Sequence, residues 1–103
     1  MFYINTDSIG VNTMATILRH ATAGTLESSD AFVTLEPSEN GLIIDIDSVV
    51  QKQFGEAIRQ TVGEVLDELG VTNAKVSIVD RGALDCVIRA RVETAVLRGR
   101  EAD

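Results

Sequence analysis

Two short runs of alternating apolar and polar residues place the strongest constraint on the fold. Residues 31–36 (AFVTLE) and residues 42–47 (LIIDID) both repeat with a period of two. This period is typical of strands that bury one face. The connecting residues include Pro37, which ends a strand, and the Asn40-Gly41 pair, which favours a tight turn. The pattern predicts that the two runs form a β-hairpin.

A helix and a third strand are predicted to follow. Apolar residues recur at spacings of three and four from Val50 to Leu69, which is the pattern of an amphipathic helix. Gly70 then stands where a left-handed residue ends many helices. Residues 75–80 (KVSIVD) alternate again, so we expect a further strand there.

The last apolar block, residues 84–98, fits two structures. Read as a strand, it turns to one side Cys86, Ile88, Ala90 and Val92. Read as a helix, it aligns on one face Leu84, Ile88, Val92 and Ala95. Its length of about 15 residues without proline favours the helix, and the strand remains the alternative. We therefore predict an α+β fold: a small antiparallel sheet, made of the hairpin and at least one further strand, with one or two helices packed on one face.

Length and charge restrict the class of protein. A chain of 103 residues suits one domain with a modest core. Its net charge of -7 disfavours binding to nucleic acid or to an anionic membrane. A single cysteine, no apolar run near the ~20 residues of a membrane span, and no signal peptide lead us to expect a cytoplasmic protein. Residues 1–13, before Met14, resemble an extension or tag that we expect to be disordered, which leaves residues 14–103 as the domain.

Residues that could catalyse a reaction are scarce. His20 has no second histidine or nearby cysteine with which to bind a metal, and no nucleotide-binding or CxxC motif occurs. Cys86 lies in a periodic apolar segment, so we interpret it as a buried structural thiol. Asp45 and Asp47 share one strand face, which we expect to be solvated. We predict no catalytic residue and no metal site.

Two adjacent serines, Ser28 and Ser29, lie in the polar stretch ATAGTLESSD. No histidine, lysine or glycine-rich oxyanion hole stands beside them to make either a nucleophile. On the residues alone, we favour a turn in which a serine hydroxyl caps the backbone. The alternative is a carrier protein, whose serine is esterified to a long phosphate-linked arm. That arrangement raises the effective concentration of an attached group at successive active sites.

Several blocks together resemble the acyl carrier subunit (gamma chain) of citrate lyase. They are AGTLESSD (23–30), TLEPSENG (34–41), KQFGEAIR (52–59), GALDC (82–86) and IRARVE (88–93). Each block alone is a weak signal, but the combination is specific and extends in register over residues 14–98.

The resemblance implies a covalent arm on Ser28, the first serine after the glutamate of GTLES, with Ser29 as the weaker candidate. The family's cofactor is 2'-(5''-phosphoribosyl)-3'-dephospho-CoA, joined through a phosphodiester by a prosthetic-group transferase. Its thiol carries acetyl and citryl thioesters. An alpha subunit exchanges acetyl for citrate, and a beta subunit cleaves the citryl group. The carrier itself is not an enzyme.

Further residues are assigned a recognition role within this resemblance. We interpret Glu27 and Asp30 as recognition or turn-forming residues, and we expect Arg89 and Arg91 to contact the arm's phosphates or an acidic patch on a partner subunit. An exposed, solvated face is the alternative for the two arginines. Alternatives for the whole chain are a carrier of a citramalate lyase or malonate decarboxylase complex, an ordinary phosphopantetheine carrier, or an unmodified interaction domain.

Overall fold

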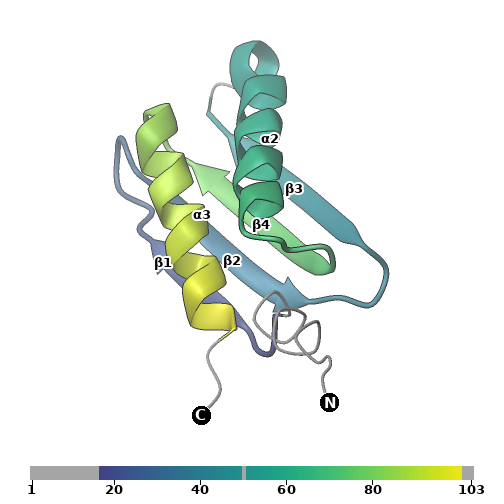
Figure 1. Cartoon of the computed structure of the whole chain (residues 1–103). Helices are drawn as coiled ribbons and strands as arrows, with labels where there is room; N and C mark the ends of the chain where they lie inside the picture. Colours follow the sequence, from purple (N-terminus) through teal and green to yellow (C-terminus); the bar gives the residue numbers. More distant parts are fainter. Residues whose placement is uncertain (1–16, 50, 101–103) are drawn as a thin grey trace, which may run out of the picture.

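The computed structural model of the protein describes residues 17–49 and 51–100. Within these residues the elements are β1 (Ala21–Gly24), β2 (Ala31–Pro37), β3 (Leu42–Ser48), α2 (Gln51–Glu68), β4 (Ala74–Asp80) and α3 (Asp85–Gly99). The strands form one sheet, and both helices cover the same face of it (Figure 1). The predicted α+β fold is confirmed. The predicted segment 1–13 lies outside the described residues.

The hairpin predicted between residues 31–36 and 42–47 is wrong, because β4 lies between these two strands. The order in the sheet is β1-β2-β4-β3. β4 pairs antiparallel with β2 and parallel with β3, so the sheet is mixed and not antiparallel. The helix α2 joins β3 to β4 and carries the chain back along the sheet, as parallel neighbours require.

The core lies between the sheet and the two helices. The inward positions of β2 and β4 are buried as the alternation predicts. The largest fully buried apolar side chains are Val33, Leu35, Val62, Leu66, Val76, Ile78, Val92 and Val96. Residues 85–99 form the helix α3, which settles the ambiguous last block. Neither described helix is both long and apolar enough to cross a membrane.

α3 packs close to the sheet at its last turn. A Cβ atom added to Gly99 would lie 2.9 Å from Leu35 Cδ2. The face that α3 buries includes Ile88 and Val92, as the helical reading predicted. Leu84, expected on the same face, precedes the helix and is 71% exposed.

A buried carboxylate closes the end of β4. Asp80 is 1% exposed, and its Oδ2 accepts a hydrogen bond from the Ser48 hydroxyl at 2.8 Å. Its Oδ1 accepts the N–H groups of Gly82 at 3.2 Å and Ala83 at 2.9 Å. The side chain therefore joins the ends of β3 and β4 and shapes the turn that leads into α3.

We expect Asp80→Ala to lower the free energy of unfolding by about 2–3 kcal/mol, because it leaves donors in this turn without an acceptor. Urea denaturation measures the loss. The control is Asp45→Ala, which removes an exposed carboxylate from β3 and should change stability by less than about 0.5 kcal/mol. Equal effects of the two substitutions would contradict a structural role for the Asp80 contacts.

Candidate functional site

The two serines lie in a loop of residues 25–30, here called the serine loop. It connects β1 to β2, which pair antiparallel from Ala21 opposite Leu35 to Gly24 opposite Phe32. β1 has only four residues and is not predicted by the sequence pattern. Figure 1 shows the serine loop at the end of the sheet where β4 finishes and α3 begins.

Backbone hydrogen bonds fix the serine loop to the residue after β4. The N–H of Ser29 donates to the carbonyl of Arg81 at 2.8 Å, and the N–H of Arg81 donates to the carbonyl of Asp30 at 2.9 Å. Within the loop, the N–H of Asp30 donates to the carbonyl of Glu27 at 3.1 Å. Ser29 has a φ of 67°, a left-handed conformation that closes the turn. The loop therefore has a defined backbone.

An ion pair ties the serine loop to α3. The Arg91 guanidinium donates from Nε to Asp30 Oδ1 and from an Nη to Oδ2, both at 2.9 Å. The Thr25 hydroxyl and the N–H of Ala31 also donate to this carboxylate, at 2.6 and 2.7 Å. The Arg91 bonds, followed by those of Thr25 and Ala31, hold the pKa of Asp30 well below its usual value. Asp30 is therefore ionised at neutral pH, and Arg91 contacts the loop.

Ser28 projects from this fixed loop with its hydroxyl exposed. Among the described residues, no donor or acceptor forms a hydrogen bond with the side chain of Ser28 or Ser29. The turn is capped by other residues: Thr25 Oγ1 accepts the N–H of Glu27 at 3.2 Å, and Asp30 accepts that of Ala31. The serine hydroxyls are therefore not the caps that the residues alone suggested. Glu27 is exposed beside Ser28.

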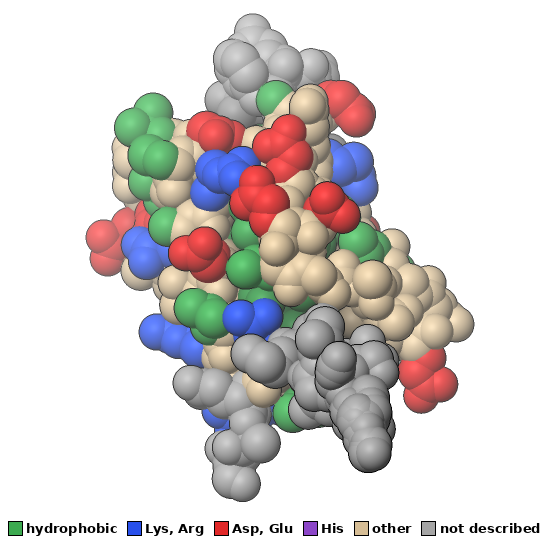
Figure 2. Space-filling view, in the orientation of Figure 1, with side chains coloured by type: hydrophobic (Ala, Val, Ile, Leu, Met, Phe, Trp, Pro, Cys, Tyr) green, Lys and Arg blue, Asp and Glu red, His purple; other side chains and the backbone are tan. Residues whose placement is uncertain are grey.

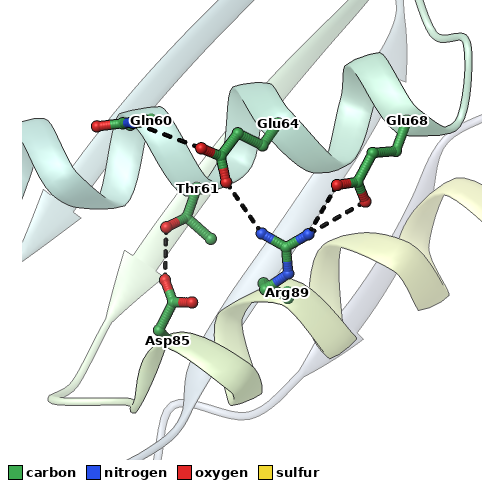
Figure 3. A network of polar contacts seen from close by, with 6 residues as sticks. All are labelled: Gln60, Thr61, Glu64, Glu68, Asp85 and Arg89. Carbon is green, nitrogen blue, oxygen red and sulfur yellow. Dashed lines mark hydrogen bonds and ion pairs between the residues drawn. The ribbon is translucent and has the colours of Figure 1, made fainter.

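Arg89 lies in a different network, between the two helices. Its guanidinium donates to Glu64 at 3.1 Å and to Glu68 at 3.0 Å, both on α2 (Figure 3). Hydrogen bonds to Glu68 and then Glu64 raise the pKa of Arg89. Thr61 donates to Asp85 in the same interface. Acidic side chains with basic ones among them lie over the two helices, beside apolar and uncharged groups (Figure 2).

Two residues at the serine loop were not singled out from the sequence. Arg81 is exposed, and no described residue pairs with its guanidinium, although its main chain holds the loop. Gly24 ends β1 with a φ of +95°, and a Cβ atom there would overlap the Ala31 carbonyl oxygen. The role of Gly24 could have been predicted, because a glycine before a polar turn often marks a left-handed residue. No sequence pattern marks Arg81.

The other cysteine, aspartate and histidine residues considered as candidates lie away from the loop or on the surface. Cys86 is exposed, so its interpretation as a buried thiol is wrong. It occupies the first turn of α3, whose buried face instead begins with Ile88. Asp45 and Asp47 are exposed on β3, as predicted. His20 is exposed just before β1.

Comparison with known proteins identifies close relatives. Residues 18–99 match an acyl carrier protein (ACP) family model described as malonate decarboxylase delta subunit (MdcD). The chain is 51% identical over 86 residues to citrate lyase acyl carrier protein 2 of Salmonella paratyphi A, covering 82% of this chain and 89% of the relative. It is 54% identical over 85 residues to the citrate lyase acyl carrier protein of Treponema denticola, covering 82% and 97%.

A solved structure shares the fold. It is a chain of a Pseudomonas malonate decarboxylase hetero-tetramer in complex with malonate, with a TM-score of 0.71 and 25% sequence identity. The match covers 81% of this chain and 86% of that chain.

We expect Gly24→Ala to destabilise the protein more than Gly41→Ala does. Both residues have positive φ angles, +95° and +85°, so both substitutions incur left-handed strain of about 1–2 kcal/mol. Only the first also forces a Cβ against backbone, because nothing lies within 4 Å of a Cβ at Gly41. Thermal unfolding of the two variants compares the effects. Equal melting temperatures would contradict the close approach of β1 to Ala31.

We expect Arg91→Ala to return the Asp30 carboxyl pKa toward its usual value of 3.8. Because the pair lowers this pKa in the folded state, its stabilisation is fully present above about pH 4 and is lost as the pH falls through the lowered pKa. Unfolding free energy should therefore fall less steeply with acid in the variant.

NMR titration of Asp30 and urea denaturation across this pH range test this effect. The control, Arg89→Ala, removes an arginine that contacts only α2 glutamates among the described residues, and it should leave the Asp30 titration unchanged. An unshifted Asp30 pKa in Arg91→Ala would contradict the ion pair.

Proposed function

The chain belongs to the citrate lyase acyl carrier protein (gamma subunit) family, whose members carry acyl groups and are not catalysts, and on that premise we propose that Ser28 bears its prosthetic arm. The observation that carries this proposal is the exposed Ser28 hydroxyl, without a hydrogen-bond partner among the described residues, on a loop fixed at both ends. A modifying enzyme can reach such a hydroxyl without unfolding the carrier.

The residues around Ser28 suit a phosphodiester-linked arm. The Ser28 hydroxyl oxygen forms the new bond to phosphorus, and its proton passes to a base of the attaching enzyme. With a triphosphate precursor, pyrophosphate departs from that phosphorus. Gly24 and Ser29 shape the turn, and no described side chain covers the hydroxyl. The protein's own contribution is position, so it needs no base beside the serine.

The arm we propose is phosphoribosyl-dephospho-coenzyme A, whose terminal thiol supplies thioester chemistry. In this role the carrier presents acetyl and citryl groups in turn to a transferase (alpha) and a lyase (beta) subunit. The names of the relatives support the citrate lyase assignment. A location in the cytoplasm accords with this role.

The three arginines near the site have separate roles in this proposal. Arg91 positions the serine loop through Asp30, and Arg89 ties α3 to α2, so carboxylates already occupy both guanidinium groups. Arg81 has no such partner among the described residues and lies beside Ser29. Of the three arginines, Arg81 is the best placed to contact a phosphate of the arm. The family resemblance suggested that role for Arg89 and Arg91.

A second candidate function is the carrier of a malonate decarboxylase complex. It is favoured by the fold shared with a chain of the Pseudomonas hetero-tetramer and by the description of the family model. The identity to that chain is 25%, against 51–54% to the citrate lyase relatives quoted above. We therefore favour the citrate lyase complex.

We expect intact-mass spectrometry to find the arm on the chain when it is produced together with the attaching enzymes. Ser28→Ala should abolish the added mass because it removes the accepting oxygen. The control, Ser29→Gly, should retain it, since glycine accepts the φ of 67° and keeps the N–H that bonds Arg81.

The size of the added mass distinguishes the alternatives. A phosphopantetheine-sized addition would indicate an ordinary carrier. An unmodified chain in cells with active citrate lyase would contradict the carrier assignment.

A further inference from the structure

A groove opens between α2 and α3 at the end of the molecule that holds the serine loop. Its volume is about 370 Å³, within the range of small-molecule sites. The lining residues are Ala57, Ile58, Asp80, Gly82, Ala83, Leu84, Asp85 and Ile88. We call it the interhelix groove.

The interhelix groove is lined mainly by apolar residues, and its two aspartates already have hydrogen-bond partners. Asp80 accepts hydrogen bonds from Ser48 and from the N–H groups of the turn, and Asp85 accepts one from Thr61. Leu84 lines the groove with 71% of its surface exposed, so it adds accessible apolar surface there. The groove therefore offers apolar surface, and its carboxylates already have partners.

The groove begins next to the attachment site. Ser29 is hydrogen-bonded to Arg81, and the next residue, Gly82, lines the groove. With consecutive Cα atoms about 3.8 Å apart and paired strand residues about 5.5 Å apart, the Cα atoms of Ser28 and Gly82 are separated by at most roughly 13 Å. An arm that contains both a nucleotide and a pantetheine unit can cross that distance.

The distribution of charge also favours a course of the arm from Ser28 past Arg81 to the interhelix groove. The arm is anionic at its phosphates and, in its acetyl form, ends in a small apolar thioester. The main chain of Arg81 lies between Ser29 and Gly82, and its exposed guanidinium, which has no partner among the described residues, can pair with a phosphate. Beyond it the apolar walls suit the acyl end. Positive charge followed by apolar surface matches the order of groups along the arm.

We propose that the arm on Ser28 folds back past Arg81 and rests with its acetyl thioester in the interhelix groove. This inference rests on the proposed function. In the groove the thioester is withdrawn from water and hydroxide between visits to the catalytic subunits. The acyl group would then survive longer on the carrier than on a free thiol.

The first test compares amide NMR spectra of the full chain with and without the arm, after intact mass has established attachment to Ser28. We expect shifts at Gly82, Ala83 and Ile88 and none on the exposed face of β3. Arg81→Gln should reduce these shifts at low salt, where an exposed ion pair is least screened.

The second test measures hydrolysis of the acetyl thioester at mildly alkaline pH. We expect a half-life severalfold longer on the carrier than on acetyl-coenzyme A. Ala57→Phe fills the groove from an exposed helical position and should remove this protection. The control, Ala90→Phe, adds the same side chain at an exposed position of α3 outside the groove and should keep it.

The outcomes separate this inference from the proposed function. No added mass on Ser28 overturns the attachment and the inference together. An attached arm without shifts at the groove, or with the hydrolysis rate of acetyl-coenzyme A, overturns the inference alone. Shifts at the groove that depend on the concentration of arm-free protein would assign it to a second copy of the chain and also overturn it. Unchanged shifts in Arg81→Gln would overturn the path past that residue.

Discussion

The ion pair between Asp30 and Arg91 is the interaction on which the presentation of Ser28 depends. β1 is a four-residue edge strand, which alone holds a loop weakly. Two charge-assisted hydrogen bonds from α3 add an anchor on the helix side, while Arg81 supplies one on the sheet side. The same carboxylate bonds Thr25 and the backbone, so one side chain organises both ends of the loop. A loop organised in this way presents its hydroxyl in one place, which lowers the entropy that a docking enzyme must remove.

Local features of the fold could be predicted, because they depend on neighbouring residues only. The inward faces of Val33 and Val76 follow from the period of an extended chain, and the end of α2 just before Gly70 follows from the left-handed backbone of that glycine. The partner of each strand could not be predicted in the same way. Alternation is identical for a strand whose neighbour is next in sequence and for one whose neighbour arrives after a helix, as β3 and β4 show.

The site shows the same division. The resemblance predicts Ser28 as the attachment site, which stays a prediction, and it treats Arg89 and Arg91 as one recognition pair. Residues two apart on a helix point to nearly opposite sides, whereas on a strand they share a face. In α3 the first therefore contacts α2 and the second contacts the serine loop. Arg81 could not be predicted, because it holds the serine loop through main-chain hydrogen bonds, and a single sequence does not show such contacts.

The ion pair that anchors the serine loop can form only late in the synthesis of the chain, because its two partners are far apart in the sequence. Asp30 and Arg91 are 61 residues apart in the chain. During synthesis the serines leave the ribosome early, yet their loop gains its anchor only after most of α3 has followed. An enzyme that recognises the anchored loop would thus modify finished domains and pass over incomplete ones. In the proposed function, the arm would then be attached only to chains whose C-terminal helix is already in place.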